Sequence, residues 1–244
     1  MQKSDAKKAE KPLSGKTAMV TGGSRGIGKA IALRLAELGA AVAICGRDKA
    51  ALENTAVELE KTGAKTYWQK ADVTRVQEIE EFVTNSERHA GPVSILVNNA
   101  GIGIFGAVQD KTEEDWDRVL DTNLKSVFLM SRAVAPGMIA RGAGDIVNIS
   151  SLAGKNAFSG GALYCASKWG LQGMTACMAE DLRGFGIRVS VICPGSVATE
   201  FGRGQKDASK VLLPEDVAHA VAMVVTQGKQ SFISEVDVRP VKKA

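Results

Sequence analysis

Two residues near the middle of the chain have types and spacing that could carry acid–base chemistry. Tyr164 and Lys168 stand four positions apart in the stretch YCASK. Four residues make about one helical turn, so on a helix the phenol and the ammonium would lie on one face. A lysine beside a tyrosine favours the deprotonated phenol, which is one way to build an acid–base group that works near neutral pH. The pair alone is not specific, because a tyrosine and a lysine at this spacing are usually ordinary surface neighbours.

A second candidate is the glycine-rich stretch TGGSRGIG, which contains Gly22, Gly26 and Gly28. It follows an apolar run and opens a helical pattern, where glycines allow a sharp turn and a close approach to a pyrophosphate. The phosphate charge would then face the N–H groups at the helix N-terminus. A plain tight turn is the alternative. A P-loop is excluded, since Lys29 is followed by Ala30 and not by serine or threonine.

Strand and helix patterns alternate along the rest of the chain. Ile27, Ile31, Leu35 and Leu38 form an apolar stripe of helical spacing, and Gly39 marks the end of that helix. Strands are predicted over 16–23, 41–46, 65–73, 94–101, 144–151 and 187–195, and helices over 25–40, 48–64 and 77–91. Alternation of this kind predicts βαβ units and a buried parallel sheet.

The predicted fold class is α/β, a single doubly wound Rossmann-type domain with a central parallel sheet and helices on both faces. We place this domain at residues 13–240, between a charged N-terminal tail (1–12) and a short C-terminal tail (241–244). In such a sheet, ligands bind outside the carboxyl ends of the strands. The glycine-rich and polar segments of the chain follow the strands, so they are expected to gather at that edge.

Composition limits the function classes. The chain has 244 residues, a formal net charge of +4, four single cysteines and two histidines far apart in the sequence. This charge is too small to argue for nucleic acid, and neither a zinc site nor a disulfide framework is expected. We see no membrane-spanning run and no secretory signal, so we expect a cytoplasmic protein without metal.

With these motifs in order, the sequence resembles the short-chain dehydrogenase/reductase family. The resemblance rests on T-G-x-x-x-G-x-G, a strand ending N-N-A-G, a serine, and Y-x-x-x-K, and it covers nearly the whole chain. Within the family, the sequence is most similar to 3-oxoacyl-acyl-carrier-protein reductases and related NADPH carbonyl reductases. The end of the chain, SFISEVDVRPVKKA, differs from the glycine-rich end usual in those reductases.

The resemblance implies a catalytic tetrad of Asn123, Ser151, Tyr164 and Lys168. Tyr164 would exchange the proton with the carbonyl or alcohol oxygen, and Ser151 would donate a hydrogen bond to that oxygen. Lys168, together with the positive ring of the oxidised cofactor, would favour the tyrosinate. Asn123 would help to order a water that connects Lys168 to solvent.

The resemblance also implies a set of NADP(H) contacts along the edge of the sheet. They lie in the glycine loop, after the second, third and fourth strands, around the catalytic pair, and in the P-G segment after the sixth strand: Gly22, Ser24, Arg25, Gly26, Ile27, Gly28, Arg47, Asp72, Val73, Asn99, Gly101, Tyr164, Lys168, Pro194, Gly195, Val197 and Thr199. For Asn99, a structural role between two strands is the alternative. Cys165 is expected to pack within its helix.

The expected activity is hydride transfer between NADP(H) and a carbonyl or secondary alcohol of ketone or 3-oxoacyl type. A nucleotide-binding relative without net redox turnover, either regulatory or an epimerase or dehydratase, is the alternative. The expected partners are a small molecule and further copies of this chain. A homodimer or homotetramer would use the Tyr164 helix and the helix before it, because the Tyr164 helix is apolar on more than one face.

The choice of nicotinamide cofactor gives a testable prediction. Enzymes that select NAD place a carboxylate at the end of the second strand, where this chain has Gly46 followed by Arg47. Arg47 and Arg25 offer two guanidinium groups to a 2′-phosphate. We therefore expect kcat/KM to be clearly higher with NADPH than with NADH, and the double change Gly46→Asp with Arg47→Ile to reverse that order. Equal kcat/KM values in the unmodified protein would contradict this interpretation.

Overall fold

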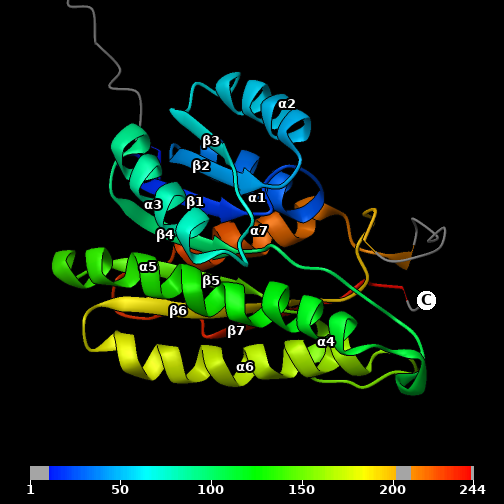
Figure 1. Cartoon of the computed structure of the whole chain (residues 1–244). Coiled ribbons are helices and arrows are strands. Elements are labelled where there is room, and N and C mark those ends of the chain that lie inside the picture. Colours follow the sequence, from blue (N-terminus) through cyan, green and yellow to red (C-terminus); the bar gives the residue numbers. More distant parts are fainter. Residues whose placement is uncertain (1–10, 202–209, 243–244) are drawn as a thin grey trace, which may run out of the picture.

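The structure is a computed structural model that describes residues 11–201 and 210–242. Strands and helices alternate through most of its length (Figure 1). The strands are β1 Thr17–Thr21, β2 Ala41–Gly46, β3 Thr66–Lys70, β4 Val93–Asn98, β5 Gly144–Ile149, β6 Ile187–Pro194 and β7 Glu235–Val238. The helices are α1 Gly26–Glu37, α2 Lys49–Glu60, α3 Val76–Ala90, α4 Glu113–Leu120, α5 Ser126–Arg141, α6 Ala162–Arg183 and α7 Pro214–Val225.

All seven strands form one parallel sheet in the order β3-β2-β1-β4-β5-β6-β7. This arrangement confirms the predicted doubly wound fold, and the order reverses between β1 and β4. Six of the strands were expected from their apolar runs. The seventh, β7, was missed because Glu235 and Asp237 alternate with its two valines, which leaves no apolar run for sequence reasoning to detect.

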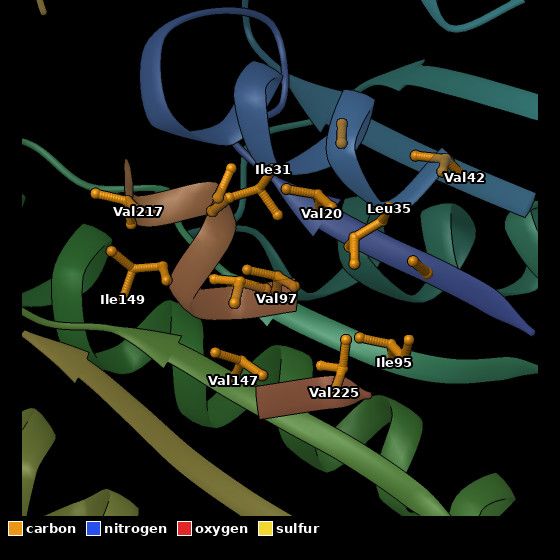
Figure 2. Packing of buried hydrophobic residues seen from close by; sticks show 14 of the residues in the cluster. Val20, Ile31, Leu35, Val42, Ile95, Val97, Val147, Ile149, Val217 and Val225 are labelled. Carbon is orange, nitrogen blue, oxygen red and sulfur yellow. The ribbon is translucent and has the colours of Figure 1, made fainter. Parts of the chain in front are cut away.

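Helices cover both faces of the sheet. On one face α1, α2 and α7 pack against the strands, and Figure 2 shows Ile31, Leu35 and Val217 from two of these helices against Val20 and Val97. On the other face α3, α5 and α6 bury a second cluster that includes Phe82, Met130 and Ala179. The two apolar layers hold the sheet rigid, and its carboxyl edge is left to the loops.

Three helix ends have distinct local structure, and the one at Gly39 is formed as the sequence predicts. Asp48 caps α2, and its carboxylate accepts a hydrogen bond of 3.1 Å from the Ala51 amide. α1 ends at Glu37, and Gly39 follows with φ of 100°, a left-handed conformation that suits glycine. α4 runs through a π-helical turn, Asp121–Lys125, directly into α5, and this irregular turn contains Asn123.

The described chain begins two residues before the predicted domain. Leu13 is fully buried, and its amide donates to the Leu38 carbonyl, so the predicted start of the domain is anchored to the end of α1. Residues 1–10, which make up most of the predicted N-terminal tail, and residues 243–244, which make up half of the predicted C-terminal tail, lie outside the described residues. Among the described helices, none is long and apolar enough to cross a membrane.

Candidate active site

The glycine loop is clamped to the end of β4 at the point where the strand order reverses. The Thr21 hydroxyl accepts hydrogen bonds of 3.0 Å from the amides of Asn99 and Ala100. The Asn99 side-chain amide donates to the carbonyls of Thr21 (2.9 Å) and Gly22 (3.2 Å). A Cβ on Gly28 would lie 2.2 Å from the Gly22 oxygen, so only glycine allows α1 to start this close to the loop. Asn99 thus has the structural role that the sequence left open as its alternative.

The segment after β6 reaches back to the same loop. Val197 is buried and forms a parallel bridge with Leu212, while the Thr199 methyl group would lie 3.3 Å from a Cβ on Gly26. Gly195 donates its amide to Val238, and a Cβ there would lie 3.0 Å from Pro240. The predicted Thr199 therefore lies beside the start of α1, while Val197 is held in the same segment by Leu212. Much of the segment that follows, 202–209, is outside the described residues.

Charged groups gather beyond the ends of β2 and β3. Burial raises the pKa of Asp72, but hydrogen bonds from Thr74 and the nearby guanidinium groups of Arg47 and Arg75 outweigh it and lower that pKa. The Thr74 contacts, of 3.0 and 2.8 Å, both use the Asp72 Oδ1 atom. Val73 beside it is buried. Arg47 thus lies near the residue predicted to contact adenine.

Arg25 and Gly46 are the other two residues from which the preference for NADP(H) was predicted, and both have close neighbours in the structure. Arg25 forms an exposed ion pair of 3.1 Å with Glu200. A Cβ on Gly46 would lie 3.3 Å from the Ser24 hydroxyl, so a carboxylate at position 46 would stand against the glycine loop. Position 46 is therefore placed to influence a group bound by that loop.

Ser151 stands at the end of β5, where it caps the short 3₁₀ turn Leu152–Gly154. Its hydroxyl accepts a hydrogen bond of 3.1 Å from the Ala153 amide and is half-buried. The preceding Ser150 is buried, and its hydroxyl points to the Lys168 carbonyl at 3.4 Å. The two serines thus face different surroundings. Ser151 is the one beside the Tyr164 phenol, where its hydroxyl acts to lower the pKa of that phenol, and the same hydroxyl lies 3.5 Å from the Pro194 carbonyl.

Tyr164 and Lys168 lie in the first two turns of α6. The Lys168 ammonium nitrogen is 5.8 Å from the centre of the Tyr164 ring, and it donates a hydrogen bond of 2.8 Å to the Ile149 carbonyl. Lys168 is only 4% exposed. The helical spacing therefore brings the two groups together as predicted, and the carbonyl of Ile149, the last residue of β5, binds the lysine ammonium.

Burial acts on the pKa values of both groups. Burial raises the pKa of Tyr164 to about 12, since the Ser151 hydroxyl only partly offsets the loss of solvent. Burial also lowers the pKa of Lys168 to about 8. Both charged forms are thus disfavoured in the protein alone, and the expected tyrosinate, which relies on Lys168 together with the positive ring of the oxidised cofactor, stays a prediction.

Asn123 joins the segment after β4 to α6. Its side chain is fully buried, with Oδ1 accepting from the Ile102 amide at 2.8 Å. Its Nδ2 atom donates to the Ile102 carbonyl at 2.9 Å and to the Ser167 hydroxyl at 3.0 Å. The side chain therefore positions that segment, and the role of Asn123 in ordering a water stays a prediction.

The residues along this edge fit a nicotinamide dinucleotide. Gly22 and Gly26 have φ of 64° and 52°, which only glycine adopts freely, and a Cβ at Gly101 would press on Asn123 at 3.3 Å. A backbone cradle at a helix N-terminus suits a pyrophosphate, and the arginines beyond β2 suit a further phosphate. In the described part of the chain, no group of histidine, cysteine or acidic residues could hold a metal ion.

Sequence reasoning missed the aromatic surroundings of Tyr164. The rings of Phe105 and Phe201 contact the Tyr164 ring from two separate loops, and Phe158, from a third loop, packs against Phe105. The available signal was that these rings lie within a few residues of the N-N-A-G, serine and P-G motifs. Phenylalanines in loops beside glycines are poor candidates for the core, and their position after these motifs could have placed them at the site.

Comparison with known proteins agrees with this geometry. The family model for short chain dehydrogenase matches residues 16–210. The chain is 35% identical to glycine betaine reductase of Emericella nidulans over 94% of its own length, although it spans only 19% of that protein. It is 40% identical to 2-(S)-hydroxypropyl-CoM dehydrogenase 3 of Xanthobacter autotrophicus, over 83% of this chain and 79% of the relative.

A solved structure is similar over nearly the same extent. A metagenomic short-chain oxidoreductase in complex with NADP superposes with a TM-score of 0.85 at 43% sequence identity. The match covers 95% of this chain and all of the other. The similarity therefore includes the whole carboxyl edge of the sheet.

The buried amine of Lys168 gives a prediction for stability against pH. Its folded-state pKa of about 8 lies below the ordinary 10.5. Between these values the unfolded chain keeps a proton that the folded chain has released, so this group makes the fold more stable as pH rises from 8 to 10.5. We expect the free energy of unfolding of the wild type to gain about 3 kcal/mol over that of Lys168→Met across this window.

Urea unfolding of both proteins at pH 7, 8, 9 and 10 measures this difference. Other titrating groups are common to the two proteins and cancel, and the lost bond to the Ile149 carbonyl contributes a constant offset. A difference that stays flat with pH would show that Lys168 remains charged in the folded protein.

Proposed function

Because this chain belongs to the short-chain dehydrogenase family, we propose that it is an NADP(H)-dependent oxidoreductase that interconverts a carbonyl and a secondary alcohol. The observation that carries this proposal is the meeting of Ser151, Tyr164 and Lys168 at the carboxyl edge of the sheet. It is supported by the relatives, of which one is named a reductase and one a dehydrogenase, and by the similar structure that holds NADP.

The proposed reaction is a hydride transfer coupled to a proton transfer. The bound nicotinamide supplies the hydride to the carbonyl carbon or accepts it from the alcohol. Tyr164 gives its phenolic proton to the carbonyl oxygen during reduction, and takes that proton back during oxidation. Ser151 donates a hydrogen bond to the same oxygen and stabilises the negative charge that develops there.

The pKa values favour the reductive direction for an isolated Tyr164. A phenol with a pKa of about 12 is fully protonated at neutral pH and is ready to donate. Oxidation requires the tyrosinate, which needs positive charge nearby, and among the described residues the Lys168 ammonium lies 5.8 Å from the centre of the Tyr164 ring. With a pKa of about 8, Lys168 is mostly protonated at pH 7, and it can return a proton to Tyr164 after each reduction.

Asn123 acts in this proposal as a positioning residue. Its three hydrogen bonds fix Ile102 against α6, and Ile102 belongs to the segment that carries Phe105. The irregular π-helical turn puts its side chain between α6 and that segment. Its role is to hold the substrate side of the site at a fixed distance from Tyr164.

The cofactor in this proposal is NADP(H). Gly22, Ser24, Gly26, Ile27 and Gly28 would hold the pyrophosphate, and Arg47 and Arg25 would receive the 2′-phosphate. Asp72 and Val73 would lie at the adenine, and Val197 and Thr199 at the nicotinamide. The Arg25 pair with Glu200 is compatible with this role, because an exposed ion pair is weak and can exchange for a phosphate.

The assembly is proposed to be a homodimer or homotetramer that pairs α5 and α6 with their copies. Both helices lie together on one side of the molecule (Figure 1). They expose large rings, with Phe128 of α5 48% exposed and Trp169 of α6 54% exposed.

The proposed location is the cytoplasm. All four cysteines are free thiols, which supports this location.

Replacing the phenol of Tyr164 tests the activity. We expect Tyr164→Phe to retain its fold and its affinity for NADP(H), while kcat falls by about 10² to 10⁴-fold through loss of general acid–base catalysis. Oxidation of NADPH with a panel of ketones and aldehydes, followed by absorbance, measures the rate. Tyr67→Phe, which changes the only other tyrosine of the chain, is the matched control and should keep full activity.

The alternative without net redox turnover is separated by the same assay. A regulatory protein, an epimerase or a dehydratase would bind the nucleotide, and no ketone of the panel would consume NADPH. Normal turnover by the Tyr164→Phe variant would instead contradict the assigned proton donor.

A charge placed on the exposed face of α6 tests the assembly. We expect light scattering after size exclusion to give at least twice the chain mass for the wild type and a lower mass for Trp169→Arg. Val57→Arg, at a position on α2 that is 52% exposed, is the control and should keep the wild-type mass. A monomeric wild type would overturn the proposed assembly.

A further inference from the structure

The surface around the Tyr164 phenol is built from phenylalanine. The Phe105 ring meets the Tyr164 ring edge-on with centroids 5.5 Å apart, and the Phe201 ring lies 5.8 Å from it on another side. Phe158 contacts Phe105 at 6.0 Å. The chain has only seven phenylalanines, so two of them against Tyr164 with a third behind Phe105 is a concentration that packing of the core does not require.

These three rings, which we call the aromatic wall, are accessible to a ligand. Phe105 is 37% exposed, Phe158 48% and Phe201 36%. Rings that served only to fill space would be buried with the core clusters, but none of the three belongs to either cluster. Exposed aromatic surface beside a reacting group is the usual lining of a small-molecule site.

The backbone holds two of the rings in place. The Gly106 amide donates to the Gly160 carbonyl at 2.9 Å, which ties the loop of Phe105 to the loop of Phe158. Lys111 donates from its ammonium to the Phe105 carbonyl at 2.9 Å. The wall is therefore anchored from both loops.

Two glycines, which have no side chain, leave space for the rings of the aromatic wall. A Cβ on Gly103 would lie 2.6 Å from the Phe105 ring and 3.1 Å from the Phe201 ring. A Cβ on Gly161 would lie 2.6 Å from the Phe158 ring. Side chains at these two positions would push the rings away from Tyr164, so the local sequence is fitted to the wall.

The charges near the wall do not favour an anionic ligand. The segments 102–107 and 156–161 contain no charged residue. The described cations near the wall are already engaged: Lys111 with the Phe105 carbonyl, Lys155 with Glu235 and with Asp237, and Arg25 with Glu200. A carboxylate or phosphate on the substrate would lose its hydration against apolar rings, and it would have to draw one of these cations away from its present partner.

We propose that the aromatic wall selects uncharged carbonyl compounds that carry a flat aromatic group next to the carbonyl. This inference deepens the proposed oxidoreductase function and rests on it. The aryl group packs against Phe105, Phe158 and Phe201, while the carbonyl oxygen reaches Ser151 and Tyr164. Edge-to-face contacts between rings add binding energy beyond that of apolar area alone, so an aryl ketone gains more than a saturated ketone of the same size.

The test compares acetophenone with cyclohexyl methyl ketone, which has the same carbon skeleton with a saturated ring in place of the aromatic one. For each protein, kcat/KM with acetophenone is divided by kcat/KM with the saturated ketone, and the wild-type ratio is then divided by the variant ratio. Intrinsic differences in reactivity between the two ketones cancel in this double ratio. We expect each of Phe105→Leu, Phe158→Leu and Phe201→Leu to lower the aromatic preference by about 2- to 10-fold.

Phe185→Leu is the matched control. Phe185 is 49% exposed, like the wall residues, but it lies just beyond the far end of α6. Its double ratio should equal one. Pyruvate, a small charged ketone, should be a poor substrate of the wild type.

The outcomes separate this inference from the proposed function. Turnover of both ketones with double ratios near one in all three wall variants would overturn the aromatic wall and leave the oxidoreductase function standing. Failure of every carbonyl compound to oxidise NADPH would overturn the proposed function. In that case, the aromatic wall can still be tested by the binding of the two ketones to the complex with NADP⁺, measured by saturation-transfer NMR. Equal binding of the two ketones there would refute it.

Discussion

The clamp between Thr21 and Asn99 is the constraint on which the site depends. It joins β1 to β4 where the order of the strands reverses, and the two neighbouring loops leave the sheet in opposite directions from that point. Of the four hydrogen bonds from Asn99 and Ala100, three hold Thr21 and one holds the Gly22 carbonyl, which in turn sets how closely α1 can approach. A dinucleotide bound there is positioned by main-chain atoms of the sheet itself, which are the least mobile atoms of the molecule.

A second constraint sets the chemistry. Burying a lysine costs free energy that the fold must recover elsewhere, and here the Ile149 carbonyl is its hydrogen-bond partner. The result is a pair of groups, Tyr164 and Lys168, whose pKa values have moved in opposite directions: to about 12 for the phenol and to about 8 for the amine. Both shifts favour the neutral form, so the site is poised to donate a proton in the absence of any further charge.

The fold and the main groups of the site were predictable because each leaves a local pattern. Apolar runs gave six strands, and the alternation with helices gave the parallel sheet. The spacing of Tyr164 and Lys168 gave their common face on α6. β7 left no such pattern, because an edge strand with one polar side needs no continuous apolar run. The pairing of Asn123 with Ile102 and Ser167 depends on segments far apart in the sequence, and no local signal carries that information.

The electrostatic part was the hardest to predict, for a physical reason. A pKa depends on how much solvent the rest of the chain removes, and this is known only when α6 has packed on β5. Sequence reasoning paired the tyrosine with a lysine and with the positive ring of the oxidised cofactor. In the protein alone, desolvation dominates for both side chains.

The two sides of the site therefore suit different kinds of ligand, because they are built from different chemical groups. On the side of β1 and β2, glycine backbone and arginines present N–H groups and positive charge, which suits a phosphorylated ligand and is weakened by salt. On the side of α6, phenylalanine rings present apolar surface, which suits an uncharged ligand and is not weakened by salt. Tyr164 lies where these two sides meet, and the rings of Phe105 and Phe201 that contact it contribute apolar surface to its surroundings. The same phenylalanines thus act on specificity through contact and on proton transfer through desolvation, so selection of the substrate and the protonation state of Tyr164 are coupled in one structure.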